Sequence, residues 1–155
     1  MIGEFRWKRT RYNLFISKWG IAIILEAGYK ILSETKRPVQ TEIIQIADNL
    51  YFYPSLQPWP ESEQLVAEEV LCFCKGLEFV RSNISRAVEN HPCLITLRSI
   101  HFSACNMQNE ALTACAIQWA SEAFDFSMPE IKAVFDNTQL PCGKYIYDFS
   151  ALVQN

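Results

Sequence analysis

The strongest periodic signal in the chain is an apolar stripe between residues 61 and 89. Its members recur every three or four residues, as one face of an amphipathic helix requires: Val66, Val70, Phe73, Leu77, Val80, Ile84 and Val88. Pro60 suits a first helical position, and Glu61 and Glu63 favour the positive end of a helix. The pattern therefore predicts one long helix over Glu61–Glu89 that lies on a sheet.

The stretch Leu94–Phe126 predicts a strand that leads into a second, mostly uncharged helix. Apolar positions in the strand change phase near Arg98-Ser99, which is typical of a β-bulge. We expect Asn106 to cap the helix and Met128-Pro129 to stop it. One helical face is apolar and rich in small residues: Gln108, Leu112, Cys115, Ala116, Trp119, Ala120, Ala123 and Phe124. We expect this strand and helix to be the packing centre of the protein.

Shorter patterns complete the prediction. The expected elements are a strand over Tyr12–Ser17, a helix over Trp19–Glu34, a hairpin of Val39–Ala47 and Leu50–Tyr53 around Asp48-Asn49, and strands over Glu130–Asp136 and Lys144–Phe149. In the last strand Tyr145, Tyr147 and Phe149 share one face. Together these elements indicate an α+β fold. Residues 1–155 are expected to form a single two-layer domain, with a largely antiparallel sheet and two or three helices packed on one face.

Charge is distributed unevenly along the chain. The net charge is −3, yet residues 1–18 hold five cations against Glu4 alone. This start is therefore +4, and the remainder is −7. An acidic body disfavours nucleic acid as a direct partner and is compatible with a basic protein partner.

The N-terminal residues pass from a basic to an apolar segment, as a signal peptide does, but Lys18 and Glu26 interrupt the apolar run. No uninterrupted apolar run approaches the ~18–20 residues that a membrane span needs. We therefore expect a cytoplasmic protein with no membrane partner. Its six cysteines are expected to be reduced and mostly buried.

Candidate chemistry is sparse. Cys72 and Cys74 are two positions apart on a predicted helix, so they cannot face one ion, and no ligand doublets have zinc spacing. No phosphate-binding loop or nucleophile motif occurs. We expect no metal, cofactor or catalytic residue, and hence no enzyme. A small enzyme that uses Cys142 in a turn, or His101 on a strand, is the alternative.

The candidate partner-binding site is the acidic and aromatic segment Asp48–Glu69. Its sequence PSLQPWPESE places an aromatic residue and carboxylates on a predicted loop, a combination common at interfaces. The expected binding residues are Asp48, Trp59, Glu61, Glu63, Glu68 and Glu69. In the competing interpretation Trp59 packs over the core edge and the glutamates complement the helix dipole.

The C-terminal block Ile100–Phe149 combines a strand, a helix containing QWASEAF (Gln118–Phe124) and the strand KYIYDF (Lys144–Phe149). With this combination of elements the chain resembles the immunity proteins that accompany polymorphic toxins, including those of contact-dependent growth inhibition systems. The resemblance implies a cytoplasmic protein, monomeric or homodimeric, that binds one cognate toxin domain and blocks it. Many such toxins are basic nucleases, which an acidic body would attract. The alternative is a homo-oligomer that associates through the Val66–Val88 stripe.

Overall fold

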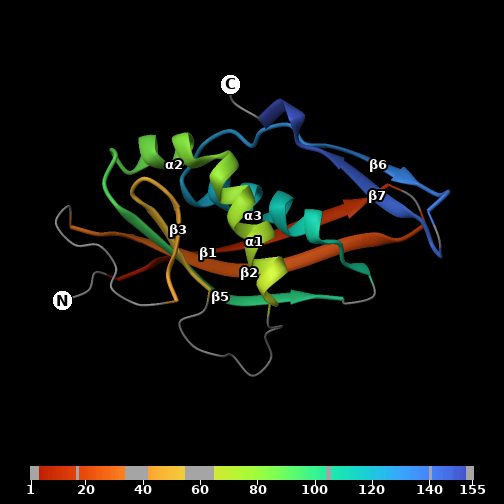
Figure 1. Ribbon diagram of the computed structural model, residues 1–155, viewed down its shortest axis with the longest axis horizontal. Coiled ribbons are helices and arrows are strands. Elements are labelled where there is room, and N and C mark those ends of the chain that lie inside the picture. The colour runs from red at the N-terminus through yellow and green to blue at the C-terminus, as the bar shows by residue number, and fades with distance from the viewer. Residues whose placement is uncertain are drawn as a thin grey trace.

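A five-stranded sheet and a layer of helices make up most of the protein (Figure 1). The computed structural model describes residues 4–16, 18–33, 42–54, 65–103, 106–139 and 141–152. The strands are β1 (Arg6–Phe15), β2 (Gly20–Ile31), β3 (Ile44–Ala47), β4 (Leu50–Tyr53) and β5 (Cys93–Phe102). Their order is β1-β2-β5-β4-β3, and every pairing is antiparallel except that of β4 with β5.

The helices are α1 (Ala67–Phe79), α2 (Arg81–Ala87) and α3 (Asn109–Ala123). A separate hairpin of β6 (Lys132–Asp136) and β7 (Lys144–Asp148) follows, and a 3₁₀ turn at Ser150–Leu152 ends the described chain. Figure 1 shows the helices against one face of the sheet and the hairpin at its right-hand end, where β1 meets β2. The predicted α+β fold with a largely antiparallel sheet is thus confirmed.

The predicted helix over Trp19–Glu34 is wrong, because Gly20–Ile31 forms β2. Its buried residues alternate along the chain: Ile21, Ile23, Leu25, Ala27 and Tyr29. The segment pairs with β1 on one side and β5 on the other, so it is a central strand. Its four isoleucines suit a pleated, two-sided environment better than a helix.

The predicted strand over Tyr12–Ser17 is longer, since β1 begins at Arg6. The long helix over Glu61–Glu89 is divided at Val80, which has φ −111° and ψ 19°. All members of its stripe are buried except Val66, which is 61% exposed. Residues 61–64, the predicted start, lie outside the described residues.

Two local predictions around β5 and α3 have opposite outcomes. The bulge is confirmed, because Glu26 and Ala27 of β2 pair with Ser99 and Leu97 and leave Arg98 as the extra residue. The predicted cap is wrong, because α3 follows Gln108 rather than Asn106. The helix also ends at Ala123, before Met128-Pro129.

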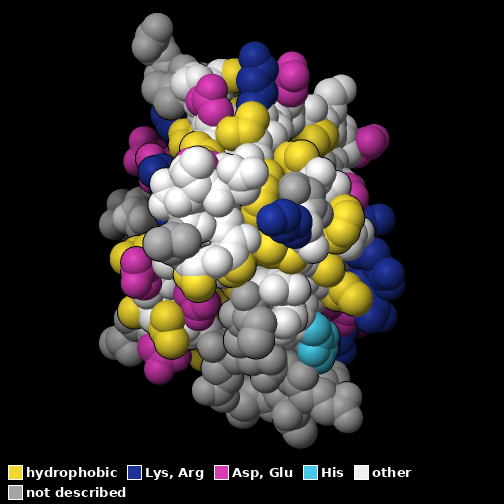
Figure 2. Space-filling view, turned by 90° about the vertical axis from the view of Figure 1, so that its right-hand side faces the viewer, with side chains coloured by type: hydrophobic (Ala, Val, Ile, Leu, Met, Phe, Trp, Pro, Cys, Tyr) yellow, Lys and Arg dark blue, Asp and Glu magenta, His cyan; other side chains and the backbone are white. Residues whose placement is uncertain are grey.

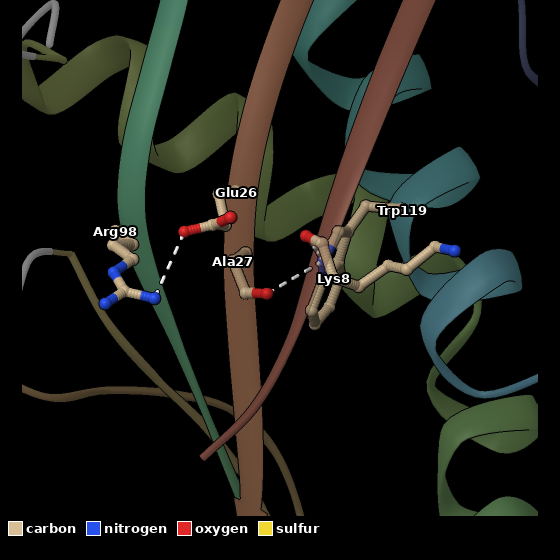
Figure 3. Close-up of polar contacts among 5 residues, drawn as sticks. All are labelled: Lys8, Glu26, Ala27, Arg98 and Trp119. Atoms are coloured by element: carbon tan, nitrogen blue, oxygen red, sulfur yellow. Dashed lines mark hydrogen bonds and ion pairs between the residues drawn. The ribbon is translucent and has the colours of Figure 1, made fainter.

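Trp119 joins α3 to the sheet. Its indole is fully buried, and Nε1 donates to the carbonyl oxygens of Lys8 at 3.2 Å and Ala27 at 3.3 Å, which lie opposite each other on β1 and β2 (Figure 3). A buried donor left unsatisfied would cost about 1–3 kcal/mol. The two carbonyls therefore determine where α3 can sit on the sheet.

Gly76 allows α1 and α3 to pack closely. A Cβ at this position would lie 2.3 Å from the Thr113 carbonyl oxygen and 2.8 Å from Ala116 Cβ. Thr113 Oγ1 also donates to the Cys72 carbonyl at 2.8 Å, so a hydrogen bond joins the helices at the same level.

We predict that Gly76→Ala lowers the free energy of unfolding by about 1–3 kcal/mol, because the methyl group forces the helices apart. In an exposed helix the same change would stabilise by about 1 kcal/mol. Urea denaturation followed by circular dichroism measures the difference. Ser82→Ala on the exposed side of α2 is the control and should change stability by less than about 0.5 kcal/mol. A more stable Gly76→Ala protein would contradict the close helix packing.

Candidate functional site

Tyr145 connects the β6–β7 hairpin to the turn between β1 and β2. Its hydroxyl accepts from the Ile16 backbone N–H at 3.0 Å and donates to the Trp19 carbonyl at 2.5 Å. Its own backbone N–H and C=O bond to the side-chain amide of Gln108, each at 2.8 Å. One buried residue of β7 thus binds the hairpin, the β1–β2 turn and the start of α3 to one another.

Aromatic contacts reinforce this junction. Trp19 meets Tyr145 and Phe135 edge to face, with ring centroids 5.0 and 5.8 Å apart. The Trp19 indole N–H donates to the Cys142 carbonyl at 3.0 Å, and the hydroxyls of Tyr12 and Tyr147 share a hydrogen bond of 2.9 Å. The hairpin is therefore held on the end of the sheet by polar and aromatic contacts together.

Four large apolar side chains are exposed at the end of the protein where the hairpin packs on the sheet. They are Phe15 (74%), Ile16 (52%), Val134 (60%) and Ile146 (41%), and we call them the tip surface. They make up half of the exposed large apolar side chains among the described residues. Figure 2 looks onto this end and shows hydrophobic side chains spread across it. Exposed apolar groups gathered in this way mark interaction sites.

The outer face of the hairpin has the composition of a small interface. Val134 lies opposite Ile146 on the two strands. On either side of this apolar pair are pairs of opposite charge, Lys132 with Asp148 and Lys144 with Asp136. An apolar centre with a charged rim is the usual anatomy of a protein–protein contact.

A second exposed region is the face of the five-stranded sheet that none of the described helices covers. We call its exposed and half-buried part the open sheet face: Trp7, Arg9, Arg11 and Phe15 of β1, with Arg98 and His101 of β5. Arg98 Nη1 lies 3.2 Å from Glu26 Oε1 (Figure 3), and its guanidinium carbon lies 4.6 Å from the Trp7 ring centroid. The bulge thus directs Arg98 across β2 towards β1.

The predicted acidic site is only partly described. Asp48 is exposed in the turn between β3 and β4, beside a cavity of about 470 Å³ that Arg81 and Arg86 of α2 also line. Glu68 and Glu69 lie in the first turn of α1, a helix length of about 20 Å from α2. The structure therefore does not bring Asp48 together with this pair. Trp59, Glu61 and Glu63 lie outside the described residues.

Glu69 has a local structural role. Its Oε1 accepts from the Val66 backbone N–H at 2.8 Å, one of the groups that the start of a helix leaves without an intrahelical partner. For Glu69 the structure therefore favours the interpretation in which the carboxylate stabilises the start of the helix. Glu68 is exposed beside it, and no bond of this kind is described for its side chain.

Most of the cysteines in the described part of the chain are buried, as predicted. Cys74, Cys93 and Cys115 are buried, Cys72 is half-buried and Cys142 is exposed in its turn. Burial raises the pKa of the Cys74 and Cys93 thiols to about 12, and it raises that of Cys115 as well. His101 is exposed on β5, as expected of a sheet residue. Within the described ranges, no three His, Cys, Asp or Glu residues gather as metal ligands.

Sequence reasoning missed the tip surface, although part of its signal was present. Ile146 alternates with Tyr145 and Tyr147 along its strand, so alternation alone predicts that it faces away from them. The position of Phe15 and Ile16 beside the hairpin depends on contacts between residues more than 120 positions apart. No local pattern records such a contact.

Comparison with known proteins adds no relative. No family model matches the sequence, no curated protein matches it significantly, and no solved structure significantly matches the fold. Among the described residues, no helix is both long and apolar enough to cross a membrane.

We predict that iodoacetamide at pH 7.5 modifies Cys142 before Cys74, Cys93 or Cys115 in the folded protein. The thiolate is the reactive species, and burial both shields the three core thiols and keeps them protonated. Peptide mass spectrometry over a time course measures the order. Cys142→Ser should remove the early modification, and denaturant should expose the core thiols. Early labelling of Cys115 would contradict the packing around α3.

The Tyr12–Tyr147 pair predicts loss of stability in alkali. Burial raises the pKa of Tyr12 to about 12 and also raises that of Tyr147, while an unfolded tyrosine titrates near 10. The neutral hydroxyls therefore stabilise the fold below pH 10, and this contribution is lost as the pH rises towards 12. We expect the free energy of unfolding to fall by about 1–3 kcal/mol across this window.

The double variant Tyr12→Phe/Tyr147→Phe isolates this effect from the buried cysteines, which also titrate in alkali. Replacing both partners by apolar rings of similar shape should change stability little at pH 7. Chemical denaturation at several pH values should show a shallower decline for the variant. An identical decline in both proteins would assign the alkaline loss to other groups.

Proposed function

We propose that this protein is an immunity protein, which binds a cognate toxin domain and blocks it. The observation that supports binding is the tip surface, an exposed apolar group on a scaffold held by Tyr145. The toxin as partner follows from the resemblance of the C-terminal block to immunity proteins. That block supplies α3, β6 and β7, and hence two of the four tip residues.

The construction of the tip favours tight binding. Phe15 and Ile16 border the turn whose backbone bonds to Tyr145, while Val134 and Ile146 pair across two hydrogen-bonded strands. A surface held in one conformation loses little entropy when a partner docks. Its apolar groups can therefore contribute more of their burial energy to affinity.

Charge supports the choice of partner. The protein as a whole carries a net charge of −3, which would attract a basic toxin domain and speed the encounter. The charged pairs around Val134 and Ile146 would then form the polar rim of the contact. In this proposal the segment Asp48–Glu69 supplies long-range attraction, and the tip supplies the contact.

The decisive experiment expresses the open reading frame immediately upstream in a host strain, with and without this protein. We predict that the neighbour is toxic, that this protein restores growth, and that the two co-purify. The double variant Val134→Glu/Ile146→Glu should abolish rescue and weaken binding at least about 100-fold, since it removes two apolar anchors that the toxin would cover.

The matched control is Val66→Glu/Leu71→Glu, which changes two equally exposed apolar residues at the start of α1. It should rescue growth as the unchanged protein does, and thermal melts should show both variants folded. If only the α1 variant fails, the binding surface lies at the acidic segment and the tip proposal is wrong. A harmless neighbour, or a toxic one that does not bind, contradicts the immunity function itself.

A further inference from the structure

The open sheet face carries a row of cations along β1. Strand alternation places Arg9 and Arg11 on this face, while Thr10 and Tyr12 between and beyond them are buried under the helices. Both arginines are exposed, and β5 adds Arg98 and His101 to the same face two strands away. On the β4 side of this face, Tyr51, Leu94 and Thr96 are buried. The basic residues named here therefore lie on β1 and on the second half of β5.

Aromatic rings stand at both ends of the row. Trp7 lies opposite Gly28 and Phe15 lies opposite Gly20 in the register of β1 and β2. A Cβ on either glycine would come within 2.7 Å of the Trp7 ring or 2.4 Å of the Phe15 ring. Each ring thus rests on the neighbouring strand where no side chain intervenes. Phe15 stays 74% exposed, and Trp7 carries the Arg98 guanidinium above it.

Negative charge is nearly absent from the described strands of the five-stranded sheet. Glu26 is the only carboxylate in β1 to β5 as described, and Arg98 lies 3.2 Å from it. The acidic residues of the helix layer are Glu68, Glu69, Glu78, Glu110 and Glu122. In Figure 2 several Lys and Arg side chains lie along the right-hand edge, and most Asp and Glu side chains lie at the top and left. The fold therefore places arginines from the basic start of the chain on a face that holds little negative charge.

We propose that the open sheet face binds single-stranded nucleic acid. In this arrangement phosphates lie at Arg9, Arg11 and Arg98, and a base stacks on Phe15. Exposed aromatic rings combined with a basic track are the general means of holding single strands. Arg9 and Arg11 follow one strand between two aromatic rings, which suits a linear polyanion better than the rounded surface of an acidic protein. This proposal reverses the expectation from net charge. Its arginines lie outside the tip surface, with which the open sheet face shares Phe15.

The test is fluorescence anisotropy of a labelled 12-nucleotide single strand of mixed sequence, titrated with the full chain at 50 to 200 mM salt. We expect saturable binding that weakens as salt rises. Arg9→Ala/Arg11→Ala should weaken it at least about 10-fold, and should reduce the slope of log affinity against log salt by about 1.4, because two phosphate contacts are lost. Phe15→Ala should weaken it roughly 5-fold or more through lost stacking.

The matched control is Arg81→Ala/Arg86→Ala, which removes two exposed arginines from α2 on the helix side. It should bind within about twofold of the unchanged protein, and thermal melts should confirm that all variants are folded. Three results would overturn the proposal: no saturable binding at 50 mM salt, equal loss in both arginine pairs, or displacement of the oligonucleotide by poly-glutamate at equal charge. The last result would assign the face to an acidic protein partner. Toxin rescue by Arg9→Ala/Arg11→Ala should stay intact, so failure of this proposal and failure of the immunity function are distinguishable.

Discussion

The buried indole of Trp119 is the contact on which the arrangement of layers depends. Its single N–H is shared between carbonyls of two paired strands, so α3 can lie over β1 and β2 in only one position that satisfies the donor. Around it α3 presents alanines and a cysteine, which are small enough for close approach to the sheet and to α1. The glycine at position 76 makes the corresponding space on α1. The Trp119 N–H, which must find an acceptor, thus fixes the position of α3 within a largely apolar core.

Placing the helices on one side of the sheet has a consequence for the other side. Residues of β1 and β2 that alternate with the core point away from every described helix, and there the chain carries arginines and aromatic rings. The bulge in β5 extends this pattern, because the extra residue Arg98 turns across β2 to reach Glu26 and Trp7. One irregularity in a strand therefore joins three strands on the exposed face.

The tip surface has a different origin. The β6–β7 hairpin has no pairing with the five-stranded sheet and is held instead through Tyr145 and Gln108. Because its inner aromatic face is used in that contact, its outer face is left to solvent with Val134 and Ile146 at the centre. The apolar surface is thus centred on the hairpin and the basic surface on the sheet, and the two meet at Phe15.

Local periodicity predicts the apolar stripe, α3, the β3–β4 hairpin, the last strand and the bulge at Arg98. These features follow from local spacing, which fixes the buried face of an element. The strand Gly20–Ile31 depends instead on pairing with β1 and β5, because its isoleucines fit both periods and the pairing selects one. Likewise, Ile16 bonds to Tyr145 of the hairpin, and Arg9 shares a face with Arg98, through the pairing of distant residues. Composition sums charges and apolar groups over the whole chain, whereas a surface depends on which of them the fold brings to the same side.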